Sequence, residues 1–410
     1  GQIIMANVSS SNGLEKRPRL AFRNTDGSHF PCWRQTSLGC IIEPYSEKVY
    51  GEHDYEVLTS SREGLQRQED HFGSKQRHDT DGYNIIPFGY CTYRNRSDDG
   101  KFAFNINTIS EKAIVSKFYP VFRFTNANST FMAEFLNSSP RVKKKLSVLA
   151  VGTSQVVLSF EALKAAKFDL PCKDEQDKIA AFLECLNTRI ENQRTLVVAL
   201  KKYKRGVVRT LLSPKHCKLK NVEWTTAKIG DIGTFIKGAP LSKADISSDG
   251  TPFILYGELY TTYNEVISKV VRKTQASVDK QYYSQIGDVI IPTSGETPEE
   301  ISTASCVMLP DIILAGDLNI YRCTQVDGRI MSYILNHVVN DRIARVAQGK
   351  SIVHVQATEI SKIEITYPDL ISQKKLIETF DAITARIDQS MRELELLQVH
   401  RKALLQQLFI

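Results

Sequence analysis

The sequence predicts an α+β fold class: two pseudo-symmetric mixed α/β domains separated by an antiparallel two-helix coiled coil. Three observations lead to this prediction. Residues 152–171 align without a gap with residues 349–368, an offset of 197, so the chain contains a long internal repeat. Each copy is followed by a heptad pattern of about 38 residues, which is typical of a coiled-coil helix. Each copy also follows a region in which short β-rich runs alternate with Gly, Pro and Asn, as they do in mixed domains.

The repeat fixes the domain organisation. The motif W-x4-L/I-G occurs at Trp33 and again at Trp224, so two units of about 190 residues each begin near a Trp. We expect Gly1–Ile4, which precede Met5, to derive from cloning. The predicted segments are an N-terminal extension (1–29), a first domain (30–172), a first spacer helix (173–213), a second domain (214–369) and a second spacer helix (370–410).

The two regions between the repeated motifs, 33–151 and 224–348, are called here the first and the second body. They diverge in sequence: HDTDGYNIIPFGYCTYRNRS (78–97) has no clear counterpart in QYYSQIGDVIIPTSGET (281–297). Apolar runs such as VFRF (121–124) and DVIIP (288–292) indicate strands. Both bodies are therefore predicted to be mixed α+β domains.

The repeated tails predict two long helices. Seam positions from Ile179 to Leu211, and from Leu376 to Leu408, follow the same 4-3 spacing. Pro171 and Pro368 stand just before these helices, where proline is tolerated. A helix of about 38 residues is roughly 57 Å long. We expect the two helices to pair antiparallel; the alternative is that each helix lies on its own domain.

Both seams carry polar residues at matching positions. Gln193 corresponds to Ser390, and Lys204 corresponds to Arg401. A polar seam residue lowers stability but fixes register and partner. We expect the two cations to extend out of the seam or to be held by carboxylates, either on the facing helix or on a docked partner. Leucine at both positions is then expected to preserve folding and to strengthen helix pairing.

The composition excludes several classes of protein. Lys and Arg outnumber Asp and Glu by 53 to 46, a net charge of +7, which mildly favours a polyanionic partner. The eight cysteines contain no C-x-x-C pair and the eight histidines no H-x-x-x-H, so we expect no metal site. No apolar stretch approaches 18 residues, so a cytoplasmic location without a membrane span is expected. Gly349-Lys350-Ser351 is not a phosphate-binding loop, because Ala344 stands where that motif needs Gly.

The doubled order of motifs resembles the specificity subunit of type I DNA restriction-modification systems, a bacterial defence family. The resemblance covers the chain from about residue 30 onward. The residues that carry it are Trp33, Leu38, Gly39, Gly152, Ser154, Leu163, Pro171, Gln176 and Ile179 in the first copy, and Trp224, Ile229, Gly230, Gly349, Ser351, Ile360, Pro368, Gln373 and Leu376 in the second.

The resemblance implies a non-catalytic DNA reader that binds no cofactor of its own. Each target-recognition domain would read one half of a bipartite site in double-stranded DNA, and the helices would set the gap. Two methyltransferase subunits, which use S-adenosylmethionine for DNA methylation, would dock on the chain, and restriction/translocase subunits would complete the complex. The alternatives are a DNA-reading subunit of a related phage-defence system, an autonomous methyltransferase or nuclease, and a coiled-coil assembly protein without DNA contact.

Candidate DNA-contacting residues are polar side chains on segments without apolar periodicity, because base edges are read by Arg, Gln, Ser, Thr and carboxylates. Solvated loops, plain turns, strand entries and a solvated helix end are the structural alternatives. The candidates are Arg62, Gln66, Arg67, Lys75, Arg77, Arg94, Arg96, Lys143, Lys144, Thr153, Ser154 and Gln155 in the first domain, and Thr293, Ser294, Glu296, Gln348, Lys350 and Ser351 in the second.

Overall fold

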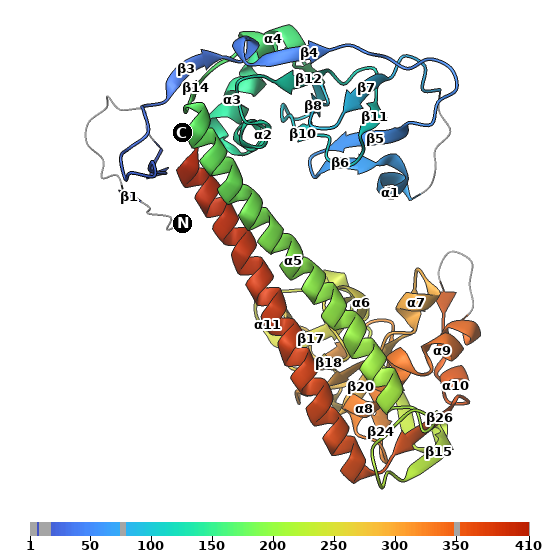
Figure 1. Cartoon of the computed structure of the whole chain (residues 1–410). Coiled ribbons are helices and arrows are strands. Elements are labelled where there is room, and N and C mark those ends of the chain that lie inside the picture. Colours follow the sequence, from blue (N-terminus) through green and yellow to red (C-terminus); the bar gives the residue numbers. More distant parts are fainter. Residues whose placement is uncertain (1–5, 8–17, 74–78, 348–352, 410) are drawn as a thin grey trace. The chain divides into compact units, whose positions relative to one another are not determined.

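The computed structural model describes residues 6–7, 18–73, 79–347 and 353–409 (Figure 1). The chain divides into two compact units, residues 1–193 with 393–410, and residues 194–392. Each of the long helices, α5 (Lys173–Leu211) and α11 (Leu370–Leu408), contributes to both units. We describe each unit by itself.

The first unit contains two four-stranded sheets, with strand orders β10-β8-β12-β4 and β6-β5-β11-β7. Helices α2 and α3 follow the last strand of the first sheet. The elements are β1 (Ala6–Asn7), β2 (Leu20–Ala21), β3 (Arg34–Ser37), the 3-10 helix η1 (Leu38–Cys40), β4 (Ile42–Tyr45), β5 (Glu56–Ser61), β6 (Gly64–Arg67), α1 (Gln68–Phe72), β7 (Asn84–Pro87), β8 (Cys91–Tyr93), β9 (Arg96–Ser97), β10 (Phe104–Ile106), β11 (Lys112–Val115), β12 (Val121–Phe124), α2 (Ser129–Ser138), α3 (Pro140–Leu149), β13 (Val156–Val157), α4 (Phe160–Ala165) and β14 (Lys167–Leu170).

The second unit contains a five-stranded sheet with the order β16-β24-β20-β22-β18 and a three-stranded sheet with the order β19-β17-β23. Its elements are β15 (Trp224–Lys228), η2 (Ile229–Asp231), β16 (Gly233–Lys237), η3 (Lys243–Asp245), β17 (Thr251–Leu255), α6 (Glu258–Thr261), β18 (Val266–Ile267), β19 (Arg272–Thr274), η4 (Lys280–Tyr282), β20 (Asp288–Pro292), β21 (Ser294–Gly295), α7 (Pro298–Ile301), β22 (Ser305–Val307), β23 (Ile313–Ala315), β24 (Leu318–Cys323), α8 (Gly328–His337), α9 (Asn340–Val346), β25 (Val353–His354), α10 (Ala357–Ile360) and β26 (Glu364–Pro368).

The W-x4-L/I-G motif connects the beginning of each repeat to its end. In the first unit it forms β3, which pairs antiparallel with β14, the strand just before α5. In the second unit it forms β15, which pairs in the same way with β26, just before α11. The motif glycine is required because the turn packs closely: a Cβ on Gly230 would lie 2.8 Å from the Cβ of Ser361. The two ends of each sequence repeat therefore meet in one two-stranded sheet.

A buried glutamine at the start of each long helix ties that helix to its body. Gln176 donates to the carbonyl of Pro171 (3.0 Å) and accepts from the backbone N–H of Asn128 (2.9 Å). Gln373 repeats both bonds with the carbonyl of Pro368 and the N–H of Asp327, each at 2.8 Å. Both glutamines are buried, so these bonds satisfy backbone groups that would otherwise lack partners.

The two bodies share a fold although their sequences diverge. The strand order β10-β8-β12-β4 of the first unit matches the order β22-β20-β24-β16 of the second. Gly89 and Gly287 both adopt positive φ (80° and 96°) just before β8 and β20. Asn137 binds both backbone groups of Phe104, and Asn336 binds both backbone groups of Ala304. Residues 89–97 therefore correspond in structure to residues 287–295, although the segments 78–97 and 281–297 have no clear correspondence in sequence.

The long helices run antiparallel where they meet in the first unit (Figure 1). Gln193 donates to Glu393 (3.1 Å), and Arg401 donates to Asn187 (2.6 Å). The partner on α11 moves toward the C-terminus as the residue on α5 moves toward the N-terminus, which confirms the predicted direction. The C-terminal end of α11 also enters the core of the body, where Phe409 packs edge-on against Phe131 and Phe135 of α2.

The seam cations are held by carboxylates, but not by carboxylates of the facing helix. Lys204 pairs with Glu265 of the second body at 2.9 Å, and Arg401 pairs with Glu134 of the first body at 2.5 Å. Leucine at both positions would leave Glu265, which is largely buried, with one cation fewer, and this cost opposes the expected gain in helix pairing.

Acid should weaken the second unit through Glu265. Burial opposes ionisation of Glu265, but the hydrogen bond from His337 and the charge of Lys204 lower its pKa to about 2. A depressed carboxyl pKa stabilises the fold above the unfolded value of about 4.3, and that contribution is lost as the pH falls toward 2. We expect wild type to exceed Glu265→Gln in unfolding free energy by about 3 kcal/mol at pH 6, with the difference shrinking by pH 3. Urea unfolding of both proteins measures it; parallel pH profiles would contradict it.

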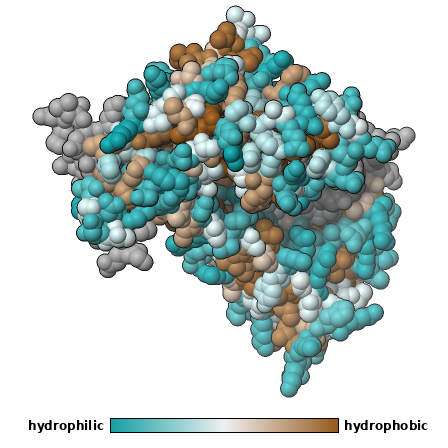
Figure 2. All heavy atoms as spheres, turned by 45° about the horizontal axis from the view of Figure 1, so that its top comes forward, coloured by the Kyte–Doolittle hydropathy of each residue, from teal (hydrophilic) through white to brown (hydrophobic). Residues whose placement is uncertain are grey.

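No helix within the described residues is long and apolar enough to cross a membrane. Hydrophilic side chains cover most of the face seen in Figure 2, and apolar residues form smaller patches between them. In the same described ranges, no three His, Cys, Asp or Glu side chains gather as metal ligands.

Candidate nucleic-acid interface

One short strand pairing brings two candidate segments together in each unit. In the first unit, β13 pairs with β9, and the N–H of Leu158 donates to the carbonyl of Asn95 (2.9 Å). In the second unit, β25 pairs with β21, and the N–H of Val355 donates to the carbonyl of Thr293 (3.0 Å). The loop after β8 in the first unit, and the loop after β20 in the second, therefore lie beside the short strand (β13 or β25) of the repeated segment, 152–171 or 349–368. The sequence suggested these segments separately. In the first unit the structure brings Gln155 to Asp98, whereas Gln348, Lys350 and Ser351 of the second unit lie outside the described residues.

In the first unit this site is a small basic hollow of about 110 Å³. Arg62 lines it from the turn between β5 and β6, Arg94 from the loop after β8, and Arg96 from the short strand β9. The Arg96 guanidinium lies 5.2 Å from the centre of the Phe118 ring, an arrangement that limits its rotamers. Both Arg94 and Arg96 are exposed to solvent. The full lining is Ser60, Ser61, Arg62, Arg94, Arg96, Ser97, Asp98, Lys101 and Ala103.

Asp99 organises the cations of this hollow. It accepts from Arg62 at 2.6 Å and lies 3.3 Å from the ammonium of Lys101. Desolvation opposes its ionisation, but hydrogen bonds from Ser97, Lys101 and Arg62 hold the pKa of Asp99 well below its usual range. Asp99 therefore stays charged and orders Arg62 and Lys101, while Arg94 keeps its exposed charge.

The remaining candidates of the first unit differ in their contacts and in their exposure to solvent. Arg67 is paired with Glu56 at 2.9 Å, and Gln66 contacts His71 at 3.0 Å, so both are engaged within their own hairpin and helix. Gln155 reaches Asp98 at 3.0 Å and so joins the basic hollow. Thr153 and Ser154 are exposed beside it, and Lys143 and Lys144 are exposed on α3. Lys75 and Arg77 lie outside the described residues.

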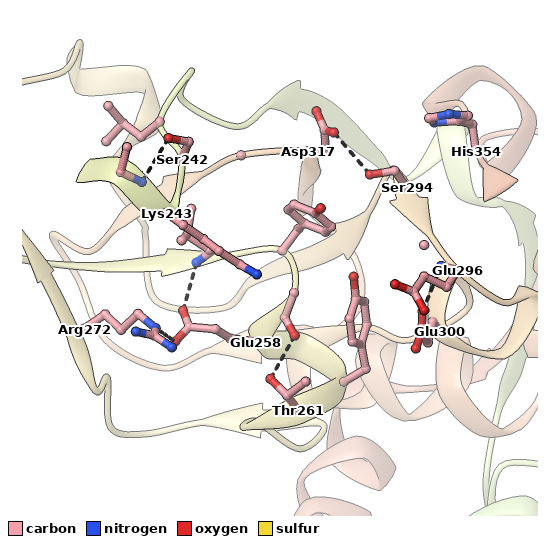
Figure 3. A pocket seen from close by; sticks show the side chains of 18 residues that line it. Ser242, Lys243, Glu258, Thr261, Arg272, Ser294, Glu296, Glu300, Asp317 and His354 are labelled. Carbon is pink, nitrogen blue, oxygen red and sulfur yellow. Dashed lines mark hydrogen bonds and ion pairs between the residues drawn. The ribbon is translucent and has the colours of Figure 1, made fainter. Parts of the chain in front are cut away.

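In the second unit the corresponding site is a larger groove (Figure 3). A hollow of about 960 Å³ lies beside Ser294, Glu296 and Glu300, and a second one of about 1000 Å³ shares part of its lining. Ser294 is buried and donates to Asp317 at 3.2 Å, so its hydroxyl is committed within the protein. The residues common to both hollows are Leu241, Ser242, Gly316, Asp317 and His354.

Among the described residues, four carboxylates and two cations line the first of these hollows: Glu258, Glu296, Glu300 and Asp317, with Lys243 and Arg272. The backbone N–H of Glu296 donates to Glu300 (2.9 Å), which leaves the exposed carboxylate of Glu296 at the rim. Glu258 is almost fully buried, where it accepts from the N–H of Leu255 and from Arg272 at 2.7 Å. Burial also raises the pKa of Tyr260 to about 12, so its hydroxyl remains a hydrogen-bond donor. Gln348, Lys350 and Ser351 lie outside the described residues, and Thr293 is half-buried below the rim.

The two sites differ in the groups they offer to a ligand. Arg and Lys bind the O6 and N7 acceptors of guanine, whereas Asp and Glu accept from the N4 amino group of cytosine. The first site presents mainly arginine side chains, whereas the second presents the carboxylates of Glu296 and Asp317 together with the cations Lys243 and Arg272. Sequence reasoning missed Lys101, Asp317 and His354. The only available signal was a glycine just before Lys101 and just before Asp317, which indicates a turn.

The comparisons identify the family. A model of the type I restriction modification DNA specificity domain matches residues 43–200 and again residues 221–398. The chain therefore belongs to that family, with two copies of its domain. No curated protein matched the sequence.

Solved structures share the fold at low sequence identity. The S subunit of a type I restriction-modification system from M. genitalium is 15% identical, with a TM-score of 0.54, over 96% of this chain and 99% of that one. A chain from a study of complex assembly and conformational transition of the type I R-M system is also 15% identical, with a TM-score of 0.57, over 92% of this chain and 97% of that one. These likenesses concern the fold.

Proposed function

We propose that this chain is the DNA-specificity subunit of a type I restriction-modification complex, in which each body reads one half of a bipartite duplex site. The observation that carries the proposal is the repeated pairing of β9 with β13 and of β21 with β25. The same backbone frame presents mainly arginine side chains in one unit and a mixture of carboxylates and cations in the other. A pseudo-repeated frame with different side chains suits two half-sites of different sequence.

The chemistry of the complex is assigned to partners. No motif of the sequence suits methyl transfer or DNA cleavage, and the two repeats account for nearly all of the chain. We assign adenine methylation to two methyltransferase subunits that use S-adenosylmethionine, and translocation with cleavage to restriction subunits. Exposed apolar residues on the long helices, such as Tyr203 of α5 and Val399 of α11, supply contact area for docked subunits.

Duplex binding tests the proposal against its alternatives. Copurification with a methyltransferase and binding to duplex DNA that weakens steeply with salt support it, because phosphate contacts release counterions. A coiled-coil assembly protein would show neither property. An autonomous enzyme would show turnover by the pure chain with S-adenosylmethionine or with divalent metal ions, and that result would overturn the division of labour proposed here.

Alanine at Arg94 or Arg96 should relax one base position in one half-site. Loss of a bidentate base contact costs about 1–3 kcal/mol, or roughly 5- to 150-fold in binding. Competition binding with all four bases at each position of both half-sites measures the effect. Arg123→Ala is the matched control, because Arg123 lies outside this hollow and pairs with Glu43. Unchanged base preference in both Arg94→Ala and Arg96→Ala would remove these residues from the reading surface.

A further inference from the structure

We propose that Lys204 and Arg401 are positioning residues that fix the orientation of each body on the helices, and that they thereby narrow the range of half-site gaps the protein accepts. This inference rests on the proposed function. Lys204 lies on the helix that follows the first body yet binds the second body, and Arg401 lies on the helix that follows the second body yet binds the first. Each body is therefore held by the far end of the other repeat's helix.

The two anchors occupy the same position in the repeat. Lys204 and Arg401 are separated by 197 residues, the offset of the sequence repeat itself. Both interrupt a mostly apolar seam, in which Gln193 and Ser390 are the other polar pair, and this costs helix-pairing stability. Nothing in the heptad pattern requires a cation there, but in both units that cation finds a carboxylate of a body. The presence of a cation at the same seam position in both repeats indicates a shared role beyond helix pairing.

The second-unit anchor is a shielded cluster. The ammonium of Lys204 lies 2.9 Å from one oxygen of Glu265, and Nε2 of His337 lies 2.7 Å from the other. The side chains of Lys204 and Glu265 are 9% and 15% exposed, so water screens their attraction only weakly. The Tyr333 ring lies 5.1 Å from the same ammonium and stacks on His337, which restricts movement of the helix across the body.

This cluster is connected to the reading groove through the sheet. The carbonyl of Glu265 accepts from the N–H of Cys306 in β22 (2.8 Å). Strand β22 pairs with β20, and the loop that carries Glu296 follows β20. A continuous path of one ion pair, backbone hydrogen bonds and the chain itself therefore joins Lys204 on the helix to the rim of the groove.

In the first unit, an equivalent series of contacts connects Arg401 to the reading loop. Arg401 donates to Glu134 of α2 at 2.5 Å and to Asn187 of α5 at 2.6 Å, so it bridges the body and both helices. On α2, Asn137 binds the backbone of Phe104 in β10. Strand β10 pairs with β8, and the loop with Arg94 and Arg96 follows β8. In both units, the contacts of the anchor lead to a strand, β10 or β22. That strand pairs with the strand that precedes the reading loop, β8 or β20.

The orientation of a body controls which gap it accepts. One base pair added to the gap rotates a half-site by about 34° about the duplex, since a turn takes about 10.5 base pairs. A body that is held in one orientation on its helices binds its half-site tightly at only one of these rotations. A body that can rock on its helices follows the rotation and accepts neighbouring gaps.

The experiment measures gap selectivity in the complex with methyltransferase subunits. Duplexes keep both half-sites and vary the gap in single base-pair steps. We expect wild type to bind the best gap on the order of 100-fold more tightly than gaps one base pair shorter or longer. The double variant Lys204→Met/Glu265→Gln should reduce this ratio to about 10-fold or less, with unchanged base preference in both halves. Arg401→Gln/Glu134→Gln should do the same from the first unit.

Controls separate positioning from stability. Lys202→Met removes an exposed cation from the same helix and should keep the narrow gap profile. Lys204→Arg retains the charge and should also keep it. Where the neutral double variant fails to fold, Glu265→Asp keeps both charges, shortens the contact by one methylene and should still broaden the profile.

Two results would overturn the inference. A lower unfolding temperature with a gap profile as narrow as that of wild type would make the anchors merely structural. A changed base preference would place them in the reading surface. The proposed function fails separately, if wild type selects no bipartite site at all.

Discussion

Replacing the first body, residues 33–151, with the matching body of another specificity subunit is expected to change one half-site entirely and to leave the other half-site and the gap unchanged. The reason is that the proposed reading residues Arg62, Arg94 and Arg96 lie within the exchanged residues and line one hollow of the first unit. The original site should lose on the order of 1000-fold in specific binding, because several mismatched base pairs each cost about 1–3 kcal/mol.

The design of the exchange follows from the contacts that cross its ends. The incoming body needs a carboxylate at the position of Glu134 and a backbone N–H at the position of Asn128, because Arg401 and Gln176 bind them. The reciprocal exchange of residues 224–348 is the matched control and should alter only the other half-site. Methylation mapping in cells that carry each hybrid gives the two sites. A change in both halves after a single exchange would contradict independent readers.

Inserting one heptad into each long helix, after Val197 and after Leu394, should abolish binding to the natural gap. Seven residues keep both seams in phase and add roughly 10 Å to each helix at 1.5 Å per residue. That length equals about three base pairs and corresponds to a rotation of roughly 100° about the duplex. We expect either a longer gap with unchanged half-sites or a loss of on the order of 1000-fold in specific binding.

The insertion has an internal control. Non-specific, salt-sensitive binding should persist, since the candidate phosphate-binding cations, such as Lys143 and Lys144, lie on the bodies. An insertion of four residues in each helix breaks the heptad phase and should lower the unfolding temperature, which the seven-residue insertion should not do. A folded heptad variant that still selects the original gap at full affinity would show that the helices do not set the spacing.

The repeat and the helices could be predicted because their signals are local. The seam from Ile179 to Leu211 needs only a 4-3 spacing, and the repeated segment needs only an aligned order of residues. The correspondence of 89–97 with 287–295 was invisible because a buried strand accepts almost any apolar residue. Only Gly89 and Gly287 keep a chemical requirement, positive φ, and two glycines are too weak a signal to align two bodies.

The anchors and the sites depend on long-range contacts that no spacing encodes. Lys204 was expected to extend from the seam or to meet a carboxylate of the facing helix or of a docked partner. Its carboxylate, Glu265, instead lies in the second body, 61 residues away, in a segment without a motif. At the reading sites, Arg94, Arg96 and Glu296 are exposed at a hollow, whereas Arg67 is paired within its hairpin and Ser294 is buried. A polar residue on a loop is equally suited to binding DNA and to holding the loop, and only the surrounding contacts decide which it does.

Mapping every methylated adenine in a host that carries this chain with its methyltransferase partners tests the central claim most directly. The account predicts one bipartite motif: two half-sites of different sequence, separated by a fixed, unspecified gap of about one duplex turn, roughly 10 base pairs. A contiguous motif, or two halves found at many gaps with equal frequency, would contradict the account.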